Sequence, residues 1–213
     1  MIRARYILFL IVIFLMNENL SAQKNQINPE TFIKEVQKQY TNLNNFVIEF
    51  TQEIFSYAIE GKQELKGKLY YSKPNNYRVE INEHLIVCDG EVVHNYSKKA
   101  RRVVITNFEK NFFSPQNLLV EVPKYSKVEL TGMESLNNKN LYKFSLLPSP
   151  SNPEFKSMKL WIDETRTIWK IQTEDWAGNH YAFIIHKFSP EQDLKSDLFK
   201  FKIPSGVKVV DLR

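Results

Sequence analysis

The sequence predicts a mainly β (α+β) fold in which a single large antiparallel sheet curls into an incomplete barrel. Short β-rich runs separated by turn residues recur through most of the chain, whereas one stretch alone has a long helical period. Some runs, 103–105 and 182–185 among them, are apolar on both faces. Such a sheet must be covered on both sides in places, or one side must hold something that is not protein.

The first segment has the features of an export signal. Arg3 and Arg5 precede an apolar run over 6–16, and a small residue, Ala22, stands where signal peptidase requires one. The run is too short to span a bilayer, and the alternative interpretation is a short buried helix. We therefore expect a signal peptide over 1–22 and a single soluble domain over 23–213.

An amphipathic helix is expected next. Asn28 is a capping residue, Pro29 suits the first helical position, and Glu30 lies at the positive end of the helix dipole. Apolar residues then recur at helical spacing to about Asn42, which predicts a helix with one buried stripe covering a sheet. The stripe comprises Phe32, Ile33, Val36, Tyr40 and Leu43.

Alternation with a period of two begins at Phe46 and predicts strands. The stretch 65–105 then reads as a meander of strands, with Asp89-Gly90 predicting a type I′ hairpin turn. Because side chains alternate across a strand, each run places a mainly apolar set of residues on one face. These sets are Phe46, Ile48, Phe50, Gln52 and Ile54; Leu65, Gly67, Leu69 and Tyr71; and Tyr77, Val79 and Ile81.

The pattern breaks between 107 and 122, where 116–120 predicts a short helix or lid that ends at Pro123. Strands are expected again over 125–130, 141–147, 158–162, 167–173 and 180–188, and a last short strand ends at Asp211. No linker, low-complexity tract or repeat divides the chain, so we expect one domain.

The sequence contains no motif for catalysis, metal or cofactor binding. It lacks a Gly-rich phosphate loop, a nucleophile elbow, an HExxH helix and paired cysteines. His180 and His186 would lie about 20 Å apart on one strand, and His84 with His94 would supply too few ligands for a metal. We therefore expect no enzyme, no metal and no cofactor.

The cysteine, charge and aromatic content narrow the range of possible functions further. Cys88 is the only cysteine, so no intrachain disulfide can form, and its apolar neighbours favour a buried hydrophobe. The net charge of +5 gives no reason to expect nucleic acid. The chain has 15 Phe and 10 Tyr against 6 Gly, which suits a cavity for a flexible apolar ligand.

Short motifs occur in a recognisable order along almost the whole mature chain. They are Phe50-Thr51-Gln52, Gly67 with 70–77, 87–90 with Tyr96, Pro115 with Leu118 and Leu119, 160–163, and the closing run 199–211. In this combination the chain resembles the LolA family, periplasmic carriers that ferry lipoproteins from the inner to the outer membrane.

The resemblance implies an incomplete barrel of roughly eleven antiparallel strands, with helices closing its mouth and acyl chains held in the hollow. Partners would be acylated lipoproteins, an inner-membrane releasing transporter of the LolCDE kind and an outer-membrane acceptor of the LolB kind. The carrier would be a periplasmic monomer. The expected cavity wall comprises Phe46, Ile48, Phe50, Leu69, Tyr71, Tyr77, Val79 and Ile81, and the expected lid comprises Phe112, Phe113, Leu118 and Leu119.

Two positions depart from the family's best-known form. That form has Arg before the Pro of the 70–77 stretch, bonded to the closed lid, whereas this chain has Lys73. Lys73 is expected to latch the lid by donating to carbonyls near 115–119, although without the planar fork of Arg. His94 replaces an aromatic residue of the strand after Asp89-Gly90.

Other functions are compatible with the same residues. The fold could serve a sensor of mislocalised lipoproteins, a carrier of another lipid, or an unrecognised hydrolase. The missing cysteine at the start of the predicted mature chain speaks against a lipid-anchored acceptor of the LolB kind, because Gln23 and not Cys directly follows Ala22.

Overall fold

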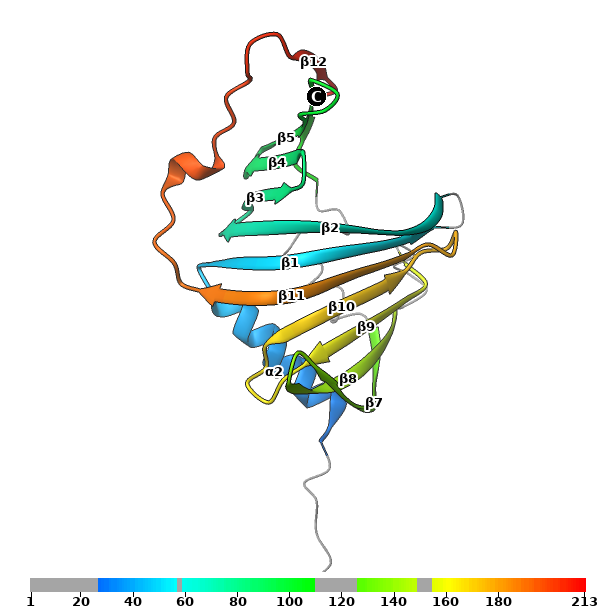
Figure 1. Cartoon of the computed structure of the whole chain (residues 1–213). Helices are drawn as coiled ribbons and strands as arrows, with labels where there is room; N and C mark the ends of the chain where they lie inside the picture. The colour runs from blue at the N-terminus through cyan, green and yellow to red at the C-terminus, as the bar shows by residue number, and fades with distance from the viewer. Residues whose placement is uncertain (1–26, 57–58, 110–125, 149–154) are drawn as a thin grey trace, which may run out of the picture.

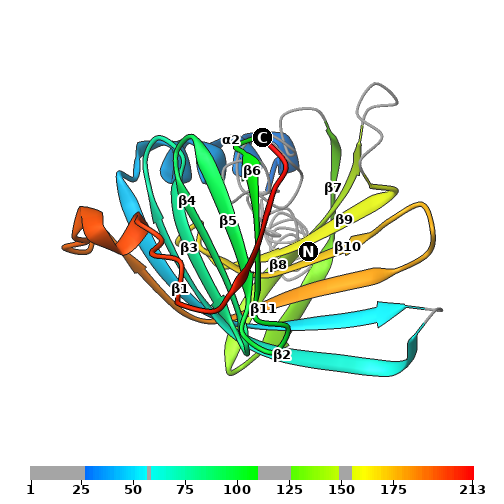
Figure 2. The ribbon, with the colours of Figure 1, turned by 90° about the horizontal axis from the view of Figure 1, so that it is seen from above.

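The computed structural model describes residues 27–56, 59–109, 126–148 and 155–213. These residues form one strongly curved 12-stranded sheet with a helix packed on it (Figures 1 and 2). The order of strands across the sheet is β12-β6-β5-β4-β3-β2-β1-β11-β10-β9-β8-β7. The predicted fold class, one large sheet curled into an incomplete barrel with an N-terminal helix, is confirmed. The predicted signal peptide, residues 1–22, lies outside the described residues and stays a prediction.

The elements follow the predicted order, and several strands are longer than the sequence indicated. They are α2 (Pro29–Asn42), β1 (Asn45–Ser56), β2 (Ile59–Ser72), β3 (Asn76–Ile81), β4 (His84–Asp89), β5 (Val92–Ser97), β6 (Arg102–Asn107), β7 (Ser126–Leu136), β8 (Lys139–Pro148), β9 (Ser157–Ile162), β10 (Ile168–Glu174), β11 (His180–Pro190), the 3-10 turn η2 (Ser196–Phe199) and β12 (Lys208–Asp211).

The helix α2 begins and ends as predicted. The side chain of Asn28 accepts a hydrogen bond from the Thr31 N–H at 2.9 Å, and Pro29 occupies the first turn. Its buried residues are Phe32, Ile33, Val36 and Tyr40. Within the part of the chain that the structure describes, no helix has both the length and the apolar character needed to cross a membrane.

Strand pairing is antiparallel except at one edge. The strand β12 pairs with β6 in parallel, with Val209 beside Val103. The predicted antiparallel pairing therefore holds across the sheet, and this parallel pair is its one exception among the described strands. The cause is the path of the C-terminal tail, which leaves β11, passes the outer side of β3–β5 and enters the edge in the direction of β6 (Figures 1 and 2).

The predicted type I′ turn at Asp89-Gly90 is also wrong. That turn requires positive φ at both residues, but only Gly90 has one, at +97°. The strand β4 ends at Asp89 and β5 begins at Val92, so the two residues that connect them are Gly90 and Glu91 rather than Asp89 and Gly90. The side chain of Asp89 accepts hydrogen bonds from the N–H groups of Glu91 and Val92, and this local bonding holds the turn one residue later than predicted.

Cover on the outer side of β3–β6 comes from the C-terminal tail. Phe199 is buried, and the ring of Phe201 lies 5.2 Å from His94 and 5.7 Å from Tyr96 between centroids. Beneath this layer Val103 is fully buried. The expectation that runs apolar on both faces are covered on both sides holds for this part of the sheet.

Candidate functional site: the inner apolar face

The inner face of the sheet is a continuous apolar surface, which we call the inner apolar face. It is defined by the buried cluster Phe46, Ile48, Phe50, Tyr71, Tyr77, Ile81, Cys88, Phe144, Leu146, Met158, Leu160, Ile162, Ile168, Ile171 and Ile185, with helix residues of α2 and Phe155 packed on it. Every member of this cluster is uncharged. Such a surface can bind hydrocarbon and can offer little to an ionic ligand.

The structure brings together all residues predicted for the cavity wall. Phe46, Ile48, Phe50, Tyr71, Tyr77 and Ile81 belong to the buried cluster, and Leu69 and Val79 are partly buried against it. The register explains this, because it stacks the three strands in rows. The rows are Phe46–Tyr71–Tyr77, Ile48–Leu69–Val79 and Phe50–Gly67–Ile81.

Aromatic contacts fix the first of these rows. The rings of Phe46 and Tyr71 stack at a centroid distance of 4.9 Å with an interplanar angle of 26°. Phe188 of β11 lies 5.9 Å from Phe46, and Tyr40 of α2 meets the same ring edge-on at 6.2 Å. Aromatic pairs in such geometries add to the free energy of simple burial.

Cys88 continues the row next to Tyr77. The thiol is free, the residue is fully buried, and its Sγ accepts a hydrogen bond from the Gly90 N–H at 3.4 Å. Burial raises the pKa of Cys88, and burial together with the neighbouring thiol raises the pKa of Tyr77. Both groups are therefore neutral near pH 7, and the interpretation of Cys88 as a buried hydrophobe is confirmed.

The wall opposite was not among the predicted site residues. It is formed by β8–β11, whose inward residues include Phe144, Met158, Leu160 and Ile171. The strands were predicted but their faces were left unassigned, since Leu160 and its neighbour Trp161 are both apolar. Trp161 lies on the outer face, where Lys143 and Lys170 stand over its ring at 5.3 and 4.5 Å.

The helix α2 covers part of the inner apolar face. Phe32 contacts Phe144 at 4.9 Å and Tyr142 at 5.4 Å between ring centroids. The hydroxyl of Tyr40 accepts a hydrogen bond from the Ile168 N–H at 3.1 Å. Burial raises the pKa of Tyr40 well above its usual range, although the bond from Ile168 acts in the opposite direction.

Lys73 and the predicted lid are described only in part. The ammonium of Lys73 donates to the carbonyl of Thr41, in the last turn of α2. A lysine at this end of a helix satisfies a carbonyl that has no partner within the helix. Its bond to the lid stays a prediction, because the lid residues lie outside the described residues, namely Phe112, Phe113, Leu118 and Leu119.

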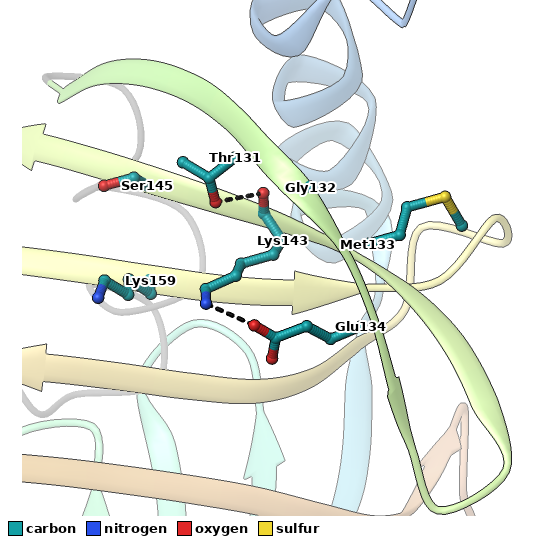
Figure 3. A pocket seen from close by; sticks show the side chains of 7 residues that line it. All are labelled: Thr131, Gly132, Met133, Glu134, Lys143, Ser145 and Lys159. Carbon is teal, nitrogen blue, oxygen red and sulfur yellow. Dashed lines mark hydrogen bonds and ion pairs between the residues drawn. The ribbon is translucent and has the colours of Figure 1, made fainter.

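The outer face carries polar hollows. One of about 210 Å³ opens at the bulge of β7 near Gly132, where Lys143 pairs with Glu134 at 2.5 Å (Figure 3). A wider one of about 700 Å³ is lined partly by Glu49 and Lys68, which also form an ion pair. Among the described residues, no group of three His, Cys, Asp or Glu side chains could hold a metal.

Comparison with known proteins gives a family match. The family model described as outer membrane lipoprotein carrier protein LolA matches residues 41–202. The outer-membrane lipoprotein carrier protein of Haemophilus ducreyi is 26% identical over 187 residues, covering 85% of each chain.

Two further matches come from proteins described as uncharacterized. One from Methanocaldococcus jannaschii is 27% identical over 191 residues, but this chain spans only 54% of its length. A crystal structure of a conserved protein from Thermus thermophilus has a TM-score of 0.56, 16% identity, and coverage of 85% of this chain and 98% of that one. This likeness shows the fold alone.

Proposed function

The chain belongs to the LolA family of outer membrane lipoprotein carrier proteins, and on this premise we propose that it carries acylated lipoproteins through the periplasm. The acyl chains bind against the inner apolar face. The protein receives its cargo from an inner-membrane transporter of the LolCDE kind and delivers it to an outer-membrane acceptor. No catalytic step is assigned to it.

The observation that supports this proposal best is the continuity of the inner apolar face. Uncharged side chains from β1–β3 and from β8–β11 join in one cluster across the curved sheet. The outer face differs, since it carries the ion pairs Glu49–Lys68, Arg78–Glu80 and Glu134–Lys143. A lipid that prefers hydrocarbon surroundings therefore binds more favourably to the inner face of the sheet than to the outer face.

The size of the hydrophobic effect explains why a carrier is needed. Exposing a sixteen-carbon acyl chain to water costs on the order of 12 kcal/mol at about 0.8 kcal/mol per methylene, and a triacylated protein about three times as much. Because the sequence contains no nucleotide-binding motif, transfer must depend on differences in affinity between donor, carrier and acceptor. A very tight carrier could not release its cargo.

A release assay tests the proposal. The mature protein is added to spheroplasts that hold a triacylated lipoprotein and its transporter, and the soluble fraction is analysed for intact lipoprotein. We expect release by the wild-type protein. Tyr77→Glu and Val79→Glu, which place a carboxylate on the inner apolar face, should reduce release. Tyr70→Glu, on the opposite face of β2, is the matched control and should retain release.

The assay also separates the other functions. A carrier of free lipid would release no protein, and a hydrolase would release a deacylated product. Circular dichroism of each variant distinguishes loss of binding from loss of fold. The carrier proposal is falsified if the intact lipoprotein stays with the membrane while the transporter and the folded carrier are both present.

A further inference from the structure

One polar side chain lies buried in the inner apolar face without a hydrogen-bond partner. Thr173 on β10 is 2% exposed, and its Oγ1 is the one buried side-chain oxygen or nitrogen that lacks a partner among the described residues. Almost all buried polar groups in folded proteins are hydrogen bonded, so such a hydroxyl requires an explanation.

The register places Thr173 on the inner face. It shares a strand face with Ile171, a member of the apolar cluster, and pairs with Met158 on β9 and Tyr181 on β11. Met158 is fully buried and apolar. The hydroxyl of Tyr181 donates a hydrogen bond to Asp175 Oδ2 at 3.3 Å. This hydroxyl is therefore directed to the turn that follows β10. Neither cross-strand neighbour bonds the Thr173 hydroxyl.

The backbone does not satisfy this hydroxyl either. The strand β10 lies between β9 and β11, and both neighbours pair with it around position 173. Valine has almost the same shape as threonine and carries no polar atom, so packing alone would favour valine here. The retained hydroxyl therefore suits a ligand that brings a polar atom to this point.

We propose that the Thr173 hydroxyl donates a hydrogen bond to an acyl carbonyl of the bound lipid, in an ester or amide linkage. This inference rests on the proposed function and adds a determinant of specificity to it. Carbonyls are the polar atoms that directly adjoin acyl chains, and an apolar surface that holds the chains brings them close to its few polar groups. Thr173 would thus fix how the lipid lies along the inner apolar face.

Matched lipids test this inference directly. A synthetic lipopeptide with two ester-linked palmitoyl chains is compared with one whose two chains are ether-linked hexadecyl groups, which lack the carbonyls. One hydrogen bond of ordinary strength predicts that the wild-type protein binds the ester form roughly five- to tenfold more tightly. Ester and ether forms of a phosphatidylglycerol distinguish a lipoprotein anchor from a free phospholipid as the source of the carbonyl.

Three variants complete the experiment. Thr173→Val should weaken binding of the ester lipopeptide to the level of the ether form and leave binding of the ether form unchanged. Thr173→Ser should keep the preference, because it keeps the hydroxyl. Thr51→Val is the control, since Thr51 is polar but bonds His186 on the outer face. Without lipid, Thr173→Val should unfold at a higher urea concentration than wild type, since a buried unpaired hydroxyl is removed.

The outcomes are distinct. Equal affinity of the wild-type protein for ester and ether forms would overturn the role of Thr173 while leaving the carrier function intact. A preference that survives in Thr173→Val would do the same. If neither lipopeptide binds, the proposed function itself fails and this inference fails with it.

Discussion

The ring of Phe50 lies over the backbone of Gly67 on the neighbouring strand. A β-carbon at position 67 would stand 2.5 Å from Phe50 Cζ, closer than real β-carbons approach other atoms. The absence of a side chain at Gly67 thus leaves the space that the aromatic ring fills in the centre of the inner apolar face.

Gly67→Ala should therefore destabilise the protein by about 1–3 kcal/mol, because the ring must move within a packed surface. Urea unfolding measures the change in the free energy of unfolding. Phe50→Leu relieves the contact, so adding Gly67→Ala to Phe50→Leu should cost clearly less than adding it to wild type. Equal costs in both backgrounds would mean that the ring does not impose the glycine.

Tyr40→Phe tests how α2 is attached to the sheet. The variant keeps the ring but leaves the buried Ile168 N–H without its acceptor, which should cost about 1–3 kcal/mol in the free energy of unfolding. Tyr142→Phe serves as the control, since the structure gives the Tyr142 hydroxyl no hydrogen bond within the described ranges. A Tyr40→Phe protein as stable as wild type would contradict the role of this bond.

His94 should make the outer layer sensitive to acid. Burial lowers the pKa of His94 below its ordinary value of 6.5, and Arg213 adds to this while Asp89 and Asp211 oppose it. The unfolded chain therefore binds the proton more readily than the folded chain does. The contribution of neutral His94 to the free energy of unfolding is therefore fully present above about pH 6.5. It is lost as the pH falls from there through the lowered pKa of the folded protein.

His94→Phe keeps a ring against Phe201 and removes the titrating group. Its free energy of unfolding should fall less than that of wild type between about pH 7.5 and about pH 5. Denaturant titrations at several pH values provide the measurement, and His84→Gln on the neighbouring strand controls for the loss of a histidine. An unchanged pH dependence in His94→Phe would show that His94 is not the acid-sensitive group.

Lys73→Leu separates the observed role of Lys73 from the predicted one. Loss of the bond to Thr41 should speed amide hydrogen exchange in the last turn of α2 by roughly three- to tenfold, as for other capping contacts. If Lys73 also latches a lid, the variant should bind more of a hydrophobic dye and be cleaved faster near residue 115. If amide exchange is faster but dye binding and cleavage are unchanged, the contact of Lys73 with α2 is supported and its role as a lid latch is excluded.

Local features of the sequence were sufficient for the elements and for one wall of the site. Asn28 and Pro29 specify the start of α2 through contacts within one turn, and alternation specifies which side chains of β1–β3 share a face. These signals are local, because a cap and a strand period depend on neighbouring residues alone. The predicted wall residues from Phe46 to Ile81 accordingly lie together.

The tertiary structure decided what depends on residues distant in the chain. In β9 both Leu160 and Trp161 are buried, and only their partners on β8 and β10 show which of them faces inward. The turn after Cys88 follows bonding by the Asp89 side chain, and β12 is parallel because the tail carrying Phe201 first crosses the outer face. The unpaired hydroxyl of Thr173 likewise emerges only in the folded protein, since a threonine within a strand sequence does not reveal whether its neighbours can accept a hydrogen bond.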